Sequence, residues 1–179
     1  MNRFLIDHHP DAIAKAMCDK HIVKMPTEEA QMLSHVLHHY LGEEGENMKE
    51  FTAELGLVNS PPAHAKHPCT EWAAETRANY LFSVDMLRAM SEEYTHRYGK
   101  THKCSLLLPF FLDCAKHIPY GHLSKHPQCF GEGNDHLKTS EIWPVQAYRN
   151  YYRWKYQTTE WCGKYKLREV PRWLKESMT

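Results

Sequence analysis

A glutamate early in the chain, Glu28, has neighbours whose types and spacing suit acid–base chemistry. On a helix, Glu28, Gln31, His35 and His39 share one face, because positions three, four and seven residues apart align. A carboxylate beside imidazoles can act as a general base or stabilise a developing positive charge. The same residues also fit the solvated face of an amphipathic helix, and the pattern alone leaves both interpretations open.

A second candidate is an arginine, Arg77, in the apolar stripe of a helix predicted over residues 70–98. A buried guanidinium without a partner is costly, so this side chain must find an anion or several hydrogen-bond acceptors. It could hold a phosphate, or a carboxylate such as Glu28, through two parallel hydrogen bonds. A structural ion pair is the alternative interpretation.

The C-terminal quarter alternates aromatic and basic residues in the run Tyr148-Arg-Asn-Tyr-Tyr-Arg-Trp-Lys-Tyr156, and Trp161 follows. Rings beside guanidinium groups are typical of proteins that stack on single-stranded or extruded bases. A helix that buries its rings and keeps its cations in water would give the same pattern. Because the segment is basic within a neutral chain, we favour an anionic ligand such as DNA or a nucleotide.

Histidine and cysteine are the possible metal ligands. The chain has 14 histidines and 6 cysteines, and pairs such as Cys18-x-x-His21 and His64-x-x-His67 have metal-ligand spacing. With so many histidines these spacings also arise by chance, and neither His-Glu-x-x-His nor Cys-x-x-Cys occurs. We therefore predict no cofactor and no metal site, and keep a His/Cys metalloprotein as an alternative.

Composition limits the class of protein. Lysine plus arginine and aspartate plus glutamate number 22 each, so no overall charge indicates a partner, although a local basic stripe can still bind phosphate. The polar N-terminus lacks the features of a signal peptide, and no apolar run reaches the roughly 18–20 residues of a membrane span. We expect a cytoplasmic protein with free thiols and no membrane partner.

Apolar periodicity predicts the elements that must position these candidates. Residues 3–6 are extended, and short helices are expected at 11–18 and near 171–174. Longer helices are predicted from Thr27 to 41, with Pro26 in the first turn, and over 70–98, 106–117 and 145–155. Loops cover 42–68, with a possible helix at 47–55, and 118–143. The sum is an all-α fold with one domain over residues 1–179.

Several motifs together resemble a known family. They are His21-x6-Glu28-x2-Gln31, His67-Pro-Cys-x2-Trp72, Arg77-Ala-Asn-Tyr80, Glu93-Tyr-x2-Arg97-Tyr-Gly-Lys-x-His102 and Ala147-Tyr-Arg-Asn-Tyr-Tyr152. This pattern, which spans most of the chain, is similar to a family of uncharacterised phage and bacterial proteins. These proteins in turn resemble the pyrimidine-dimer DNA glycosylases with AP lyase activity.

The resemblance implies a small all-α domain that flips a nucleotide out of the duplex. In that family the N-terminal amine attacks the sugar C1′, and a carboxylate stabilises the resulting cation or imine. Glu28 matches the carboxylate, with His21 and His35 near it, and the amine would come from Met1 or Asn2. The ligand or phosphate would be held by a larger set: Arg77, Asn79, Tyr80, Arg97, Tyr148, Arg149, Tyr152 and Arg153.

Two positions depart from the family pattern. Thr27 stands where the phage member of the glycosylase family has an arginine before the carboxylate. An initiator methionine is routinely removed when the second residue is small, and Asn2 is larger than those residues.

The leading hypothesis is thus an enzyme that cleaves an N-glycosidic bond in DNA or in a nucleotide. The alternative from another class is a phage accessory protein that binds a nucleotide or a host protein without turnover. In that case the basic, aromatic C-terminal segment would make the contact, and Glu28 would be structural.

Overall fold

The computed structural model describes residues 2–41 and 65–176, and within these ranges it contains helices and no strand, which confirms the all-α prediction. The α-helices are α1 (Pro10–Ala16), α2 (Asp19–Leu41), α4 (Pro68–Glu75), α5 (Arg77–Tyr98), α6 (Leu108–Cys114), α7 (Val145–Thr158) and α8 (Arg172–Lys175). Short 3₁₀ helices lie at η2 (Lys103–Leu107), η3 (Ala115–His117), η4 (Asp135–Leu137) and η5 (Glu160–Gly163).

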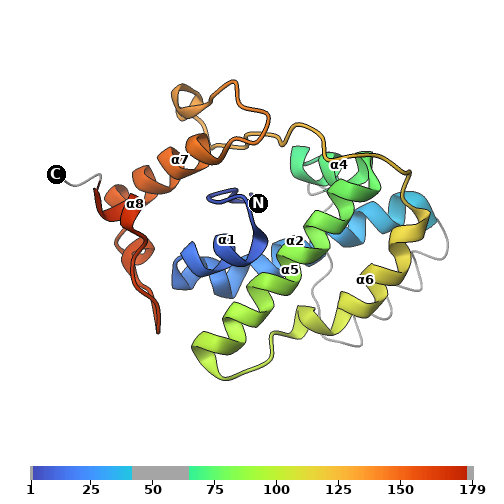
Figure 1. Cartoon of the computed structure of the whole chain (residues 1–179), viewed down its shortest axis with the longest axis horizontal. Helices are drawn as coiled ribbons and strands as arrows, with labels where there is room; N and C mark the ends of the chain where they lie inside the picture. The colour runs from blue at the N-terminus through green and yellow to red at the C-terminus, as the bar shows by residue number, and fades with distance from the viewer. Residues whose placement is uncertain (1, 42–64, 177–179) are drawn as a thin grey trace.

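The two longest helices, α2 and α5, pack against each other, and the other elements are arranged around them (Figure 1). On one side α4 and α6 complete a core around Trp72, Tyr80 and Phe111. On the other side the extended N-terminal segment lies between α7 and the α2–α5 pair, and it buries Phe4, Leu5 and Ile6 completely or nearly so (Figure 1). The N-terminal segment is thus part of the core, close to elements from the far end of the sequence.

Helix α2 begins eight residues before the predicted start at Thr27, so that prediction was wrong. Pro26 lies inside the helix rather than in its first turn. Proline removes one helical hydrogen bond, but apolar residues are buried on both sides of it, at Ile22, Met25 and Leu33. Burial of this continuous stripe carries the helix through the proline, and it places Glu28 in the middle of the helix.

The helix predicted over 70–98 is two helices separated at Thr76. The backbone of Thr76 is extended, with φ −143° and ψ 154°, and its hydroxyl caps α5 by accepting the Asn79 N–H at 3.1 Å. Contacts with the 118–143 loop fix this break, because Arg77 N–H donates to the Pro119 carbonyl at 2.7 Å and Thr76 Oγ1 donates to that of His122 at 3.0 Å. A distant loop therefore sets the corner between α4 and α5.

The remaining element predictions are largely confirmed. Residues 3–6 are extended, and α1, α6, α7 and α8 lie where short or apolar helices were expected, with 3₁₀ turns at both ends of α6. The loop 118–143 is confirmed apart from the single turn η4. Most of the loop predicted over 42–68, and the possible helix at 47–55, lie outside the described residues.

Buried ion pairs tie the two ends of the chain to the central helices. Arg3, at 1% exposure, pairs with Glu29 of α2, its Nε donating to Oε2 at 3.1 Å. Glu93 of α5 accepts from Arg97 at 2.7 Å and from Arg168 at 2.9 Å. These pairs fix the N-terminal strand-like segment on α2 and the C-terminal tail on α5.

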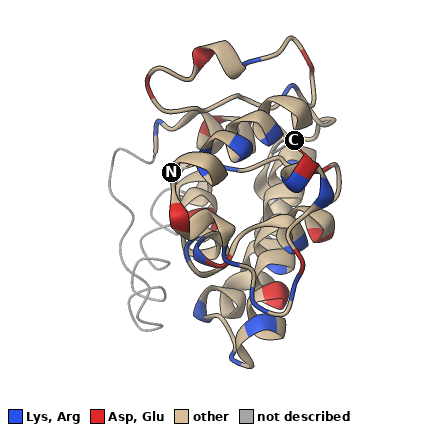
Figure 2. Ribbon diagram, turned by 90° about the vertical axis from the view of Figure 1, so that its left-hand side faces the viewer, with Lys and Arg blue, Asp and Glu red and all other residues tan. Residues whose placement is uncertain are grey.

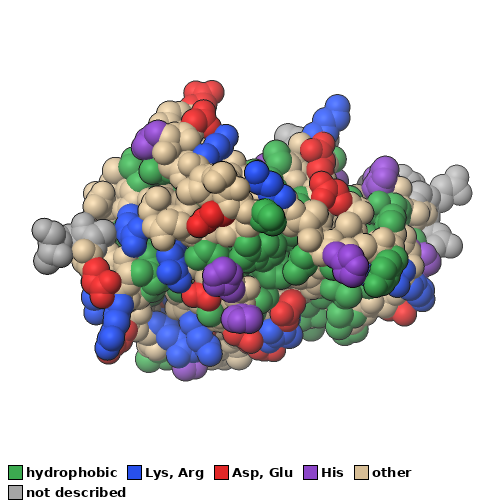
Figure 3. Space-filling view, turned by 45° about the horizontal axis from the view of Figure 1, so that its top comes forward, with side chains coloured by type: hydrophobic (Ala, Val, Ile, Leu, Met, Phe, Trp, Pro, Cys, Tyr) green, Lys and Arg blue, Asp and Glu red, His purple; other side chains and the backbone are tan. Residues whose placement is uncertain are grey.

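Charged side chains of both signs are interspersed over the elements, in keeping with the zero net charge (Figure 2). On the face shown in Figure 3, Lys and Arg side chains gather toward the end of the molecule that carries α8, and hydrophobic side chains are exposed in the centre. All six cysteines are free thiols, as predicted. Among the described helices, none is long and apolar enough to cross a membrane.

Candidate active site

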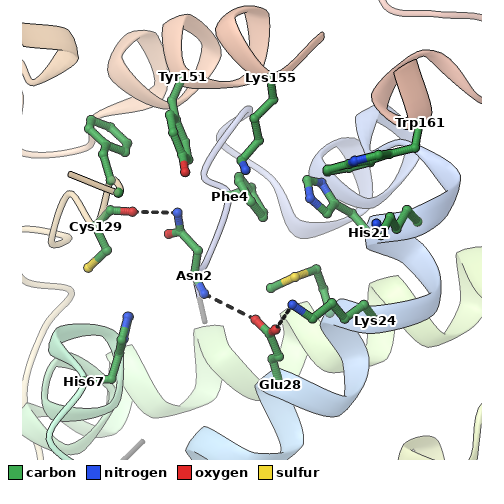
Figure 4. Close-up of a pocket in the computed structure, with 14 residues that line it drawn as sticks. Asn2, Phe4, His21, Lys24, Glu28, His67, Cys129, Tyr151, Lys155 and Trp161 are labelled. Atoms are coloured by element: carbon green, nitrogen blue, oxygen red, sulfur yellow. Dashed lines mark hydrogen bonds and ion pairs between the residues drawn. The ribbon is translucent and has the colours of Figure 1, made fainter. Parts of the chain in front are cut away.

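Glu28 lies in a cavity of about 390 Å³ between α2, α7 and the 118–143 loop (Figure 4). Its lining combines one carboxylate with three lysines, two imidazoles and several rings: Asn2, Phe4, Lys20, His21, Lys24, Met25, Glu28, His67, Cys129, Phe130, Gly131, Tyr151, Lys155 and Trp161. The volume falls in the range of roughly 300–1,000 Å³ that is usual for small-ligand pockets.

The Glu28 carboxylate is in contact with two nitrogen atoms. Its Oε2 accepts the main-chain N–H of Asn2 at 3.3 Å, and its Oε1 lies 2.7 Å from Lys24 Nζ, one helical turn earlier (Figure 4). Glu28 is 7% exposed, whereas the Lys24 side chain is 61% exposed. The carboxylate is therefore at the base of the cavity and Lys24 is at its mouth, which corrects the interpretation of Glu28 as part of a solvated face.

Asn2 is held in this position from two sides. Its Nδ2 donates to the Cys129 carbonyl at 2.6 Å, and its Oδ1 accepts the Tyr148 hydroxyl at 3.3 Å. Burial raises the pKa of Tyr148 well above its usual range, so this hydroxyl stays protonated and able to donate. Helix α7 and the loop thus position the main-chain nitrogen that faces Glu28.

His21 is fixed among aromatic rings at the opposite wall. Its ring stacks on Phe4 with centroids 4.2 Å apart, and it meets the Trp161 ring edge-on at 5.2 Å. Its Nδ1 lies 2.9 Å from the Tyr152 hydroxyl, which also accepts the Cys18 N–H at 2.7 Å. Burial raises the pKa of Tyr152 well above its usual range, so its hydroxyl stays protonated beside Nδ1.

The cations of the cavity lie over its rings. Lys20 Nζ is 4.4 Å from the centroid of Trp161, and Lys155 Nζ is 4.9 Å from that of Tyr151. Ammonium groups over rings that line a cavity can bind phosphate while the rings stack on a base. The cavity can therefore hold both the charged and the aromatic part of a nucleotide near Glu28.

The structure brings only some of the predicted site residues together. Glu28, His21 and Asn2 line the cavity, and Tyr148 and Tyr152 hold its lining from behind. Met1 lies outside the described residues. His35 is half-buried about two turns along α2 from Glu28 and is not among the lining residues.

The predicted phosphate-binding residues outside the cavity are bonded to the protein itself. Arg77 donates to the carbonyls of Ile118 and Lys116 at 3.2 and 3.1 Å. Seven other bonds within the protein involve the rest of the set: Asn79 to the Trp72 carbonyl, Tyr80 to the Phe111 carbonyl, Arg97 to Glu93 and Asp19, Arg149 to the Ile6 carbonyl and Asp7, and Arg153 to the Trp173 carbonyl. In this arrangement the polar groups of these residues hold the backbone and the helices in place.

The predicted site residues did not include the three lysines or His67, although His67 and Lys155 occur in motifs that the sequence analysis named. Lys24 precedes Glu28 by four residues, a spacing that indicates a helical ion pair, so this signal was available. No comparable signal joins Lys20, Lys155 and His67, which come from three separate elements.

The chain belongs to the pyrimidine dimer DNA glycosylase family, whose model matches residues 1–106. This confirms the resemblance proposed from the motifs. No curated protein and no solved structure matches the chain. The matched segment contributes Asn2, His21 and Glu28, while Tyr151, Lys155 and Trp161 come from beyond it and close the cavity.

Proposed function

We propose that the protein is a DNA glycosylase that cleaves an N-glycosidic bond with Glu28 as the catalytic carboxylate. The observation that carries the proposal is the contact of Glu28 Oε2 with the Asn2 main-chain nitrogen, at 3.3 Å, inside a cavity with cations and rings. A carboxylate in that place can stabilise positive charge on a sugar or on an imine. Membership of a DNA glycosylase family supports DNA as the partner.

The nucleophile in this mechanism is an amine next to Glu28. In a chain that begins at Asn2, the nitrogen facing Glu28 is the α-amine; in a chain that keeps Met1, it is an amide and does not attack. A second amine at the same carboxylate is Lys24 Nζ, 2.7 Å from Oε1. Attack on C1′ forms a C–N bond as the base leaves with the glycosidic electron pair and takes up a proton, while the amine loses a proton. The imine then forms as the C1′–O4′ bond breaks: the nitrogen gives up its second proton, and O4′ leaves with the bond's electron pair and takes up a proton.

The other lining residues have separate roles in the proposal. Lys20 and Lys155 bind the phosphates that flank the reacting nucleotide, and Tyr151 and Trp161 stack on an extruded base. His21, held by Phe4 and Tyr152, orients the sugar or a phosphate next to Glu28.

The binding protein without turnover remains the second hypothesis, but its expected contacts are occupied. It relied on Arg149 and Arg153, whose guanidinium groups are bonded to Ile6, Asp7 and Trp173. The lysines line the cavity, where they would face a ligand, and they lie beside a carboxylate that anion binding alone would not need.

The test uses duplex oligonucleotides with a pyrimidine dimer, with other base lesions or without damage, and free nucleotides as a comparison. We expect base release from damaged duplex and a covalent adduct after borohydride reduction. Glu28→Gln should lower the rate by about 10²-fold or more and leave DNA binding in place. The matched control is Glu71→Gln, an exposed glutamate of α4, which should retain the wild-type rate.

Peptide mapping of the reduced adduct identifies the amine, because the label would be found on the N-terminal residue or on Lys24. Intact-mass analysis shows whether Met1 is present. The proposal is wrong if none of these substrates loses a base, or if Glu28→Gln reacts at the rate of the wild-type protein. Tight DNA binding combined with no turnover would support the second hypothesis.

A further inference from the structure

Three side chains with metal-ligand atoms converge at one end of the cavity: His67, Cys69 and Cys129. One nitrogen or sulfur atom from each lies within 4.8 Å of the other two. His67 is the N-cap of α4 and Cys69 lies in its first turn, whereas Cys129 comes from the 118–143 loop, sixty residues beyond Cys69. His67 and Cys129 line the cavity and lie side by side (Figure 4), and Cys69 is buried behind them.

The sulfur separation fits a shared tetrahedral ion. The Sγ atoms of Cys69 and Cys129 are 3.7 Å apart. Two thiolates on one tetrahedral Zn²⁺, each at about 2.3 Å from the metal, are separated by about 3.8 Å. A disulfide instead needs about 2.05 Å between the sulfurs, so it would require the loop to move toward α4.

The imidazole is already in a suitable tautomer. His67 caps α4, with its Nδ1 accepting the Cys69 N–H at 3.2 Å. An accepting Nδ1 places the ring proton on Nε2 and leaves the lone pair on Nδ1. Ligation through Nδ1 therefore needs no proton shift, only the exchange of this N–H for the ion.

We propose that His67, Cys69 and Cys129 bind one Zn²⁺ ion beside the cavity, with a water molecule in the fourth position. One nitrogen and two sulfur ligands favour zinc, whereas magnesium and calcium prefer oxygen. On binding, each thiol gives up its proton to the solvent, and the two thiolates neutralise the charge of the ion. No oxidation or reduction takes place.

The ion would join α4 to the loop that positions Asn2. The Cys129 carbonyl accepts from Asn2 Nδ2 at 2.6 Å, and the Cys129 N–H donates to the Tyr148 hydroxyl at 3.3 Å. Fixing the Cys129 side chain therefore also fixes the backbone that holds the Asn2 nitrogen against Glu28. The role is positioning, and the zinc site stands whether or not Glu28 is catalytic.

The first experiment is metal analysis of the full chain, purified without an affinity tag and under a thiol reductant. We expect about one equivalent of zinc per chain. His67→Asn removes the imidazole but keeps a good helix cap, and Cys129→Ala removes one thiolate; both should lower zinc to below about a tenth of an equivalent. Cys114→Ala, a buried cysteine of α6 outside the proposed ligand set, is the matched control and should keep its zinc.

Cobalt provides a readout that is independent of DNA activity. Protein reloaded with Co²⁺ should show a thiolate-to-metal absorption band and strong d–d bands of a tetrahedral site, and both should be absent from Cys129→Ala. Circular dichroism of each variant establishes that it is folded.

The proposal is overturned if the protein dialysed against Zn²⁺ binds none, or if Cys129→Ala, folded, binds as much as the wild type. A mass two hydrogens lower, mapped to a Cys69–Cys129 disulfide in reductant-purified protein, would also overturn it. None of these results bears on base release, so failure of the zinc site and failure of the glycosylase proposal are distinguishable.

Discussion

The neighbouring glutamates of α2, Glu28 and Glu29, should lose very different amounts of stability on the same substitution. Glu29 is 1% exposed and accepts two hydrogen bonds from the buried Arg3 guanidinium. Glutamine at this position offers one acceptor oxygen, so its amide group would face a guanidinium N–H and a buried charge would lose its counterion. Breaking a buried pair by removing one partner costs about 3–5 kcal/mol.

That loss is a large share of the about 5–15 kcal/mol that stabilises a typical domain. For a chain of this length it corresponds to a melting temperature lower by about 6–20 °C. Glu28→Gln is the comparison, because its ion-pair partner Lys24 has a side chain that is 61% exposed. A solvent-screened pair of this kind contributes less than about 1 kcal/mol, so the variant should remain nearly as stable as the wild type.

Urea denaturation followed by circular dichroism measures both variants, and a change in midpoint at constant slope reports the change in stability. The double variant Arg3→Met with Glu29→Met should recover most of the loss, since a buried pair can be replaced by apolar side chains of similar volume. The reasoning is refuted if Glu29→Gln lies within about 1 kcal/mol of the wild type, or if Glu28→Gln is equally destabilising.

Two further predictions concern the loop 118–143 and its contacts. Burial lowers the pKa of His126 well below its usual value, so the unfolded state binds more protons than the folded state as pH falls below about 6.5. The free energy of unfolding should then decrease on acidification by up to about 1.4 kcal/mol per pH unit. In His126→Phe this decrease should be less steep, and urea titrations at pH values from 7 to 5 measure both proteins. Thr76→Ala removes the cap of α5 and should cost about 1 kcal/mol, whereas Thr76→Ser should cost less; equal midpoints for the two variants would contradict the assigned cap.

The sequence by itself determined the fold class and most of the helices, and it singled out Glu28 as the candidate catalytic carboxylate. Apolar residues at three- and four-residue spacing predict helices because this period follows from the backbone geometry of each segment alone. The motifs around Glu28 also identified the family, because they lie within one matched stretch of chain.

Helix boundaries that depend on distant contacts could not be predicted in this way. Pro26 is a sound helix-start signal, but buried residues on both sides of it continue α2. The break at Thr76 is fixed by hydrogen bonds to Pro119 and His122, more than forty residues away. Local propensity contains no information about these contacts.

The composition of the site was decided by the tertiary structure. Arg77, Arg149 and Arg153 have the chemistry of phosphate binders. In the folded protein, however, their guanidinium groups donate to backbone carbonyls and, for Arg149, also to an aspartate. Glu28, in contrast, is sheltered at the base of a cavity because the N-terminal segment and α7 pack over α2. The same packing brings His67 and Cys69 to Cys129, a juxtaposition across sixty residues of chain that spacing within the sequence could not indicate.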